Sequence, residues 1–316
     1  MTSRPWPFNK LKEPTPADWG IGMTICISAM CEPKIGERYI ITACDKMVSM
    51  SGYFSGDDVV RKIDPVAYGW TSMIAGNDVS PAIPIIGRVE EYIDANPDAE
   101  SLSSMTKHFK LAYREYRLEL IEDDILGPSG FTWDTFRQDA KAQLTDQMYA
   151  RMLDQIRAYE LDLSFIVSGF DAEGRSHIFT VSNPGKCDYY DKLGFWAIGS
   201  GQHQAIASMF ANRYGKHTSL ETCVAKVLAA KLTAETASGV GKTTWLMVHL
   251  ADPRNNTIHV SQEVMDKFRG EWNNLPRLPS SSVKGLGEDI TEQLKTILEA
   301  EANAQRSIAQ TSVGQQ

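Results

Sequence analysis

The sequence lacks several features that define particular classes of protein. No stretch approaches the roughly 18 consecutive apolar residues that a membrane-spanning helix needs. Neither sign of charge forms a long block, since 32 basic and 40 acidic residues are interspersed and give a net charge of −8. Nucleic acids and anionic membranes favour basic patches, so this distribution argues against both as partners. We expect a chain that binds neither nucleic acid nor a membrane.

Cysteine and histidine are too few and too scattered to form an obvious framework. The 5 cysteines include no CxxC pair, and none of the 6 histidines has a second ligand at metal-binding spacing. The N-terminal sequence MTSRPWPFNKLKEPTPADWG contains no apolar segment of a secretory signal. We therefore predict reduced thiols, a cytoplasmic location, no metal and no cofactor.

Short apolar runs of strand length dominate the first part of the chain. Residues 1–23 are rich in proline and non-periodic, which indicates an irregular leader or a mis-annotated start. The runs 23–30 and 38–44 flank the turn-like sequence EPKIGE and predict a β-hairpin. A third run at 69–76 precedes a helical pattern that begins near the Ser80-Pro81 pair.

Helical patterns fill the next part, and a second β-rich block follows. The segments FKLAYREYRLELI and DAKAQLTDQMYARMLDQIRAYEL predict two helices separated by a loop, DDILGPSGFTWD. Strand patterns resume at 161–171, two more helices follow GFWAIGSG, and KTTWLMVHLADP starts a last hairpin. This order of strands and helices predicts an α+β fold in which helices cover both outer faces of two stacked sheets.

The predicted domain covers residues 24–262, with a helical insert at about 120–155. Residues 263–316 are expected to form a polar linker, an amphipathic helix and a disordered tail. The apolar face of that last helix would consist of Ile290, Leu294, Ile297 and Leu298.

Separated polar residues stand at the ends of the predicted strands. Thr24 starts the first strand, Asp45 ends the second, and Lys62 lies 13 positions before the Ala75-Gly76 pair. Further along, a Gly-Ser-Gly turn and the sequence ETASG contribute the remaining candidates, Ser200, Glu235 and Ser238.

This ordered set resembles the proteasome β-subunits and the bacterial HslV peptidases, which are N-terminal-nucleophile (Ntn) hydrolases. The resemblance runs from about Thr24 to Gln262. It implies a four-layer αββα sandwich in which Thr24 is the nucleophile, supported by Lys62 and Asp45. It further implies that the N–H of Gly76 faces the oxyanion, and that three residues orient the terminal amine: Ser200, Glu235 and Ser238.

These residue types suit the chemistry. A threonine hydroxyl is a weak nucleophile at neutral pH and needs an adjacent base. The α-amine of a chain terminus has a pKa of about 7.7–8.0, so part of it is neutral at pH 7 and able to accept a proton. Such a base typically accelerates a reaction by about 10²–10⁴. One oxyanion donor contributes about 10²–10³ to kcat.

The resemblance implies a threonine peptidase that cuts peptides or unfolded proteins through an acyl-enzyme on Thr24. It also implies a homo-oligomeric ring and leaves room for an unfoldase ATPase as partner. Two other functions stay open, namely a non-catalytic structural subunit and an Ntn amidase acting on a small molecule. The subsite beside the nucleophile would be lined by Val48, Val60, Ile74 and Asp78, which favours an apolar side chain in the substrate.

The sequence departs from the family pattern at three points. Met23 precedes Thr24 where self-processing precursors usually carry glycine, and Glu235 stands where the family usually has aspartate. The first hairpin separates Thr24 from Asp45 by 21 positions, more than is usual. Thr24 would become a chain terminus if translation started at Met23 and this methionine were removed, or if the chain cleaved itself. Permanent retention of the leader would leave a scaffold subunit.

Overall fold

The computed structural model describes residues 24–46, 48–50, 54–56, 62–67, 69–96, 101–251 and 257–274. The chain divides into two units, Met1–Asp266 and Lys267–Gln316. The predicted leader, the predicted helix around Ile290–Leu298 and the tail after it lie outside the described residues. The first unit contains every described strand, and of the described residues only 267–274 belong to the second unit.

The first sheet is antiparallel and contains the N-terminal hairpin. Its strand order is β10-β1-β2-β11-β12. The strands are β1 (Cys26–Lys34), β2 (Glu37–Asp45), β10 (Phe195–Ile198), β11 (Thr244–Leu250) and β12 (Thr257–His259). The hairpin predicted around EPKIGE is confirmed, although both strands extend into that sequence and only Ile35 and Gly36 form the turn. Gly36 has a φ of +88°, a backbone conformation that glycine adopts without strain.

The second sheet is also antiparallel, with the order β5-β6-β7-β8-β9. Its strands are β5 (Ile63–Ala67), β6 (Trp70–Gly76), β7 (Leu163–Phe170), β8 (Ser176–Ser182) and β9 (Lys186–Tyr189). A separate two-stranded sheet joins β3 (Val48–Met50) to β4 (Phe54–Gly56). The strand predicted at 69–76 is β6, and the one predicted at 161–171 contains β7.

Buried side chains cover both faces of the second sheet. Phe165 and Val167 of β7 belong to a core that also contains Phe109 and Tyr113 of α2 (Leu102–Ile121). Ile166, between them in sequence, belongs instead to a core shared with Met30 of β1. Side chains alternate between the faces of a strand, so one face of β7 packs on helix and the other on the first sheet.

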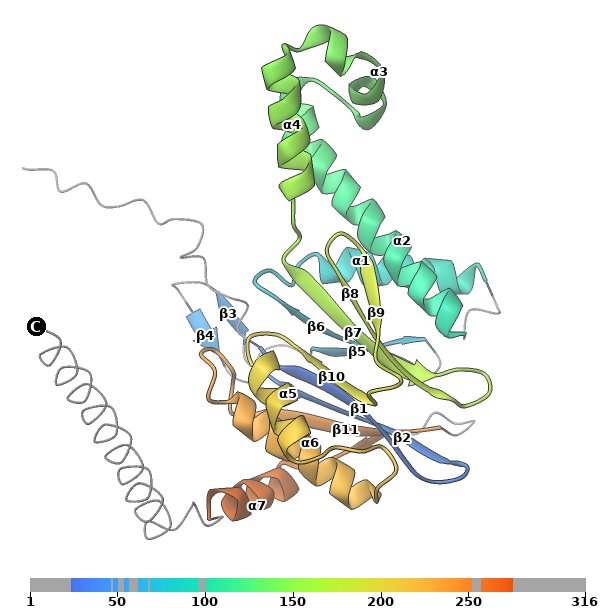
Figure 1. Cartoon of the computed structure of the whole chain (residues 1–316), viewed down its shortest axis with the longest axis vertical. Coiled ribbons are helices and arrows are strands. Elements are labelled where there is room, and N and C mark those ends of the chain that lie inside the picture. The colour runs from blue at the N-terminus through green and yellow to red at the C-terminus, as the bar shows by residue number, and fades with distance from the viewer. Residues whose placement is uncertain are drawn as a thin grey trace, which may run out of the picture. The chain divides into compact units, whose positions relative to one another are not determined.

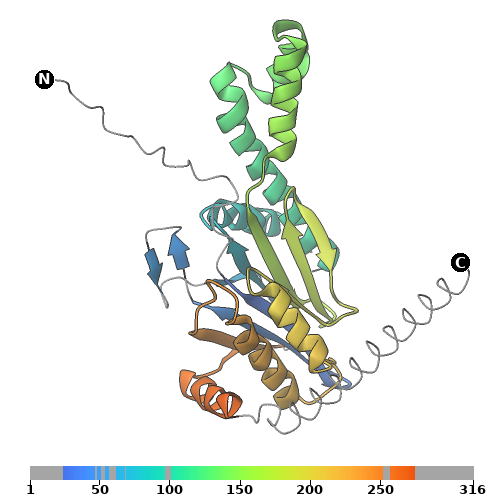
Figure 2. The ribbon, with the colours of Figure 1, turned by 60° about the vertical axis from the view of Figure 1, so that its left-hand side comes forward.

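Helices lie against each sheet (Figures 1 and 2). The helices α1 (Ala82–Asp94) and α2 contribute to the core of the second sheet. The helix α6 (Leu220–Ala234) contacts β1 and β2, and α5 (Gln202–Ala211) packs beside it. The expected α+β class, with two antiparallel sheets and helices, is confirmed.

The helical insert has a small core of its own. The helix α2 continues into a π-helical turn (Glu122–Leu126) and a 3-10 turn (Gly127–Ser129). The helices α3 (Trp133–Gln143) and α4 (Asp146–Ala158) follow and lie near the end of α2 (Figure 2). The buried side chains of this core are Leu126, Phe131, Phe136, Ala140 and Met152.

Three details of the helical predictions were wrong. The segment expected to form one helix over 139–161 is two helices, because Thr145 caps a new one by accepting a hydrogen bond from Met148 N at 3.3 Å. The expected loop at 123–134 is largely helical. A helix, α7 (Gln262–Asn273), occupies part of the expected polar linker. Within the described ranges, no helix is both long and apolar enough to cross a membrane.

A histidine between two carboxylates ties β8 to the turn before it and to the turn that follows β9. His177 Nδ1 lies 2.7 Å from Asp191 Oδ2, and its Nε2 lies 3.1 Å from Asp171 Oδ2. The ring also stacks on Trp70. Burial acts to lower the pKa of His177, but the hydrogen bonds to Asp191 and Asp171 outweigh it and raise that pKa above its ordinary value. Folding therefore favours the protonated form of His177.

We expect His177→Gln to lower the free energy of unfolding by about 1.5–3 kcal/mol at pH 6, the range for hydrogen bonds to charged groups. Because the folded-state pKa of His177 is raised, this stabilisation is full below the ordinary pKa of about 6.5 and is lost as the pH rises through the folded value. The loss caused by the substitution should therefore be smaller at pH 9, which urea unfolding at both pH values measures.

His249 supplies a matched control. It is buried beside Thr42, and burial lowers its pKa to about 4. Folded His249 is therefore neutral at both pH values, whereas the unfolded chain takes up a proton at this residue as the pH falls through about 6.5. The loss caused by His249→Gln should therefore be smaller at pH 6 than at pH 9, the opposite direction to His177→Gln. An equal loss at the two pH values for His177→Gln would contradict the charged arrangement.

Candidate active site

The register of the first sheet brings three of the predicted residues to one end of β1. Cys26 pairs with Ile198 of β10 on one side and with Cys44 of β2 on the other. Continuing these registers towards the N-terminus places Thr24 opposite Ser200 and Ile25 opposite Asp45. The structure agrees, since Asp45 N donates to Ile25 O at 3.2 Å. Antiparallel pairing alone therefore gathers Thr24, Asp45 and Ser200.

The hydroxyl of Thr24 lies between two charged side chains. It donates a hydrogen bond to Asp45 Oδ1 at 2.6 Å and accepts one from Lys62 Nζ. Lys62 Nζ is also 2.9 Å from Asp45 Oδ1, so the three groups contact one another pairwise. Thr24 is 3% exposed, Lys62 4% and Asp45 0%. The ion pair therefore lies almost completely out of water.

The carboxylate of Asp45 is fully occupied by donors. Besides Thr24 and Lys62, it accepts from the N–H groups of Ile25 and Gly241, each at 3.0 Å. A buried carboxylate with four donors fixes the position of each of them. Through these bonds Asp45 holds Lys62 beside the Thr24 hydroxyl.

A second buried lysine, which the sequence analysis did not single out, supports the loop that contacts Asp45. Lys231 of α6 is 0% exposed, and its ammonium donates to Gly241 O at 2.8 Å and to Lys242 O at 3.1 Å. It also forms an ion pair with Glu235, one helical turn further along. Since Gly241 N binds Asp45, Lys231 positions the loop that orients this carboxylate. A lysine within the apolar run AKVLAAKLTA, four residues before a glutamate, was the available signal.

The predicted role of Glu235 is therefore only partly reflected in its contacts. Its carboxylate binds Lys231, a contact that the sequence analysis did not anticipate. Ser238 has an exposed side chain, and its main-chain carbonyl is the group near the site, 3.3 Å from Ser200 Oγ. Both residues thus reach the site through a neighbour, Glu235 through Lys231 and Ser238 through Ser200.

Ser200 is the residue that contacts the backbone of Thr24. Its Oγ lies 3.3 Å from Thr24 N, from which it accepts, and 3.3 Å from Thr24 O. Gly201 N also donates to Thr24 O at 3.3 Å. Gly199 has a φ of +102°, and a Cβ at this position would lie 2.3 Å from Thr24 O. Glycine at 199 is needed for the turn to approach the start of β1 so closely.

The N–H of Gly76 points to the side of β6 on which Lys62 lies. Ile74 N donates to Lys62 O at 3.3 Å, whereas Asn77 N donates to Asp162 O at 3.2 Å on the opposite side. N–H groups of successive strand residues point to opposite edges, so Gly76 shares the direction of Ile74. A Cβ at Gly76 would lie 2.3 Å from Asp162 O, which explains why this position is glycine.

Of the four residues predicted to line a substrate subsite, the side chains of two are described. Ile74 is 6% exposed and packs in the core that faces α1 and α2. Asp78 is exposed and accepts from Ser80 N at 2.9 Å, just before α1. Val48 is the first residue of β3, but its side chain is outside the described part, as is the whole of Val60. The described residues thus bring neither Ile74 nor Asp78 into contact with the Thr24 hydroxyl.

No group of three or more His, Cys, Asp or Glu side chains in the described ranges could hold a metal ion. No protein-family model and no curated protein matches the chain.

We expect Lys231→Met to lower the free energy of unfolding by about 3–5 kcal/mol, because it leaves the Glu235 carboxylate, whose side chain is 11% exposed, without its cation. The double variant Lys231→Met/Glu235→Leu should recover much of this loss, since an apolar pair replaces the buried charges. Urea unfolding of the three proteins measures both effects.

In the double variant the Gly241 amide should still exchange its hydrogen faster than in wild type, because the loop carbonyls have lost their donor. Slow exchange in both variants would contradict a positioning role for Lys231.

Proposed function

We propose that the chain is an Ntn hydrolase of the proteasome β-subunit and HslV type, with the four-layer αββα sandwich of that family. In this proposal it is a threonine peptidase with Thr24 as its nucleophile. The supporting observation is the buried contact of the Thr24 hydroxyl with both Lys62 and Asp45. The resemblance in residue order, quoted above, supports the same conclusion independently of the geometry.

The electrostatics around Thr24 favour a nucleophile over an ordinary strand threonine. Burying a carboxylate and an ammonium costs several kcal/mol per ion before their attraction is counted. An ordinary threonine at the start of a strand needs neither group. A cation in contact with the hydroxyl oxygen stabilises the alkoxide that forms when the proton leaves. Strongly desolvated charges of this kind concentrate at functional sites.

The missing component is a base, and a free α-amine on Thr24 would supply it. In the intact chain the Thr24 nitrogen belongs to the peptide bond with Met23 and has no basic lone pair. Release of the preceding residues would convert it to an amine at the same place, 3.3 Å from Ser200 Oγ. Ser200 would then orient the amine, with Ser238 and Glu235 supporting the surrounding loops.

The reaction would proceed through an ester on Thr24. The amine takes the hydroxyl proton while Oγ attacks the peptide carbonyl carbon, and the carbonyl oxygen gains negative charge facing Gly76 N–H. Collapse breaks the C–N bond, and the leaving nitrogen takes the proton from the α-ammonium. Water, deprotonated by the same amine, then cleaves the ester and restores the hydroxyl.

The family resemblance extends the proposal to substrates and partners. Peptides or unfolded proteins would be the substrates, within a homo-oligomeric ring in the cytoplasm, with an unfoldase ATPase as partner. Val48 and Val60 are retained as candidates for the substrate subsite. Ile74, buried against α1 and α2, is a less suitable wall for it than its position in the sequence indicates.

Four forms of the chain test the assignment of Thr24. We expect a chain that begins at Thr24 to hydrolyse fluorogenic peptides and to become labelled at Thr24 by a peptide vinyl sulfone. The same chain with Thr24→Ala should lose both, whereas Thr24→Ser should retain measurable hydrolysis because it keeps the hydroxyl and the amine. The full chain, with its Met23–Thr24 bond intact, should be inactive. Peptide hydrolysis is followed by fluorescence, and labelling by mass spectrometry.

The other functions give different results in the same assay. Cleavage of small amides without cleavage of peptides, still lost in Thr24→Ala, would favour an amidase. Equal rates for wild type and Thr24→Ala would exclude Thr24 as the nucleophile and leave the structural-subunit function. The N-terminal sequence of protein purified from its natural host decides which form exists there.

A further inference from the structure

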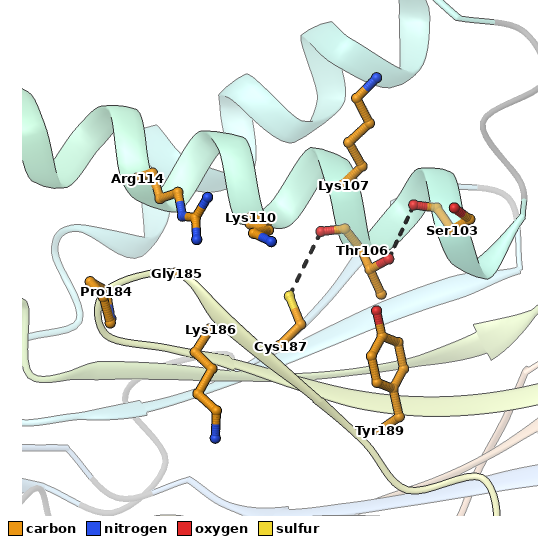
Figure 3. Close-up of a pocket in the computed structure, with 10 residues that line it drawn as sticks. All are labelled: Ser103, Thr106, Lys107, Lys110, Arg114, Pro184, Gly185, Lys186, Cys187 and Tyr189. Atoms are coloured by element: carbon orange, nitrogen blue, oxygen red, sulfur yellow. Dashed lines mark hydrogen bonds between the residues drawn. The ribbon is translucent and has the colours of Figure 1, made fainter.

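A basic pocket lies between α2 and the turn that joins β8 to β9 (Figure 3). Its volume is about 640 Å³. The α2 side contributes Ser103, Thr106, Lys107, Lys110 and Arg114, and the other wall is formed by Pro184, Gly185, Lys186, Cys187 and Tyr189. None of these residues belongs to the Thr24 site.

Three cations form one row on the helix. Lys107, Lys110 and Arg114 are spaced by three and four positions, so they share a face of α2 and span about 10 Å along it at a rise of 1.5 Å per residue. All three are exposed, and none has an ion pair with a residue in the described ranges. Other cations near this helix are bound, since Arg117 donates to Tyr159 O at 3.1 Å and Arg88 pairs with Glu119.

The opposite wall does not neutralise this row. The carboxylate of Asp188 is 2.9 Å from Lys186 Nζ, so it is paired within its own strand. Burial raises the pKa of the Cys187 thiol, and the charges of Lys110 and Arg114 oppose that shift, so both cations act on the floor of the pocket. In a chain of net charge −8, the pocket is a local concentration of unbalanced positive charge.

Close packing of the turn against α2 shapes the pocket. Gly185 has a φ of +93°, and a Cβ there would lie 2.6 Å from Arg114 Cγ and 3.2 Å from Lys110 O. The turn therefore lies directly on the stem of Arg114. Figure 3 shows the Arg114 side chain extending towards this turn, while the ring of Tyr189 rises from β9 at the other end of the pocket. The Tyr189 side chain is 57% exposed and offers an aromatic face.

We propose that this pocket binds a small organic phosphate of nucleotide size. Pockets for small molecules commonly measure roughly 300–1,000 Å³, a range that includes this one. The Arg114 guanidinium and the Lys110 ammonium match several phosphate oxygens, with the arginine able to bind two of them at once. The exposed Tyr189 ring supplies a surface on which a base can stack. Inorganic polyphosphate carries the same negatively charged phosphate groups but has no aromatic base to stack on Tyr189.

Isothermal titration calorimetry of the full chain tests the assignment, with ATP in the absence of metal, inorganic triphosphate, adenosine and a hexaglutamate peptide as probes. We expect ATP to bind, with an affinity that falls as salt is added. Lys110→Gln/Arg114→Gln should weaken ATP binding at least about tenfold, the effect of one lost hydrogen bond between charged groups. Both side chains are exposed, so the variant should fold, and its circular dichroism spectrum verifies this.

Two further variants separate the contributions. Lys141→Gln/Arg151→Gln removes the same charge from exposed positions on α3 and α4 and should change ATP affinity by less than about twofold. Tyr189→Ala should weaken ATP but not triphosphate, whereas equal effects on the two would assign the site to inorganic polyphosphate. Equal loss in the pocket and control variants, no binding of either phosphate probe, or binding of hexaglutamate alone would overturn the proposal. These measurements need no peptidase activity, so they stand or fall separately from the assignment of Thr24.

Discussion

The ion pair between Lys62 and Asp45 is the interaction on which the arrangement of the site depends. It joins the start of β5 in the second sheet to the end of β2 in the first, and both partners are nearly inaccessible to water. Charges in such a place are tolerated only when every lone pair and proton has a partner. The partners of Asp45 come from β1 and from the loop after α6. Four separate segments are therefore held at fixed distances around one carboxylate.

The position of the Asp45 carboxylate also depends on α6. The loop that presents Gly241 N to Asp45 has its own carbonyls bound by Lys231, and Lys231 is in turn paired with Glu235. Two buried lysines thus act in series, one in contact with the Thr24 hydroxyl and one behind the loop that orients its counter-ion. Helix α6 contacts β1 and β2, so the packing of this helix on the first sheet helps to determine the geometry at Thr24. Residues that do not touch Thr24 therefore help to determine the geometry around it.

Features of the fold and of the site could be predicted where the sequence signal is local, and could not where they depend on contacts between residues far apart in the chain. Strand alternation and turn residues indicated both halves of the first hairpin, and antiparallel register then made the meeting of Thr24 with Asp45 and Ser200 a matter of counting. The break before Thr145 left no glycine or proline as a signal, since only a threonine cap marks it. The apolar run around Lys231 and the glutamate four residues later were a local signal for its burial, but its main-chain partners lie ten and eleven positions away and had none.

Ile74 shows the limit of transferring a role by position. It lies two residues before Gly76, on the same face of β6 as Trp70, and that face packs against α1 and α2. Its neighbours Met73 and Ala75 face the first sheet instead. Period-two alternation could have separated the two faces, but which face pointed to the helices depended on contacts with residues far along the chain.

The residues of the site also bear on whether the chain has a catalytic or a purely structural role. Replacing a buried ion pair with apolar residues of similar volume is often neutral or stabilising, by about 1–4 kcal/mol. A subunit that served only as a scaffold would therefore gain nothing in stability from Lys62 and Asp45. The same holds for a cation placed against a hydroxyl that does no chemistry. Under the proposed function this cost is accounted for, because the oxygen on which the two charged groups converge is the proposed nucleophile.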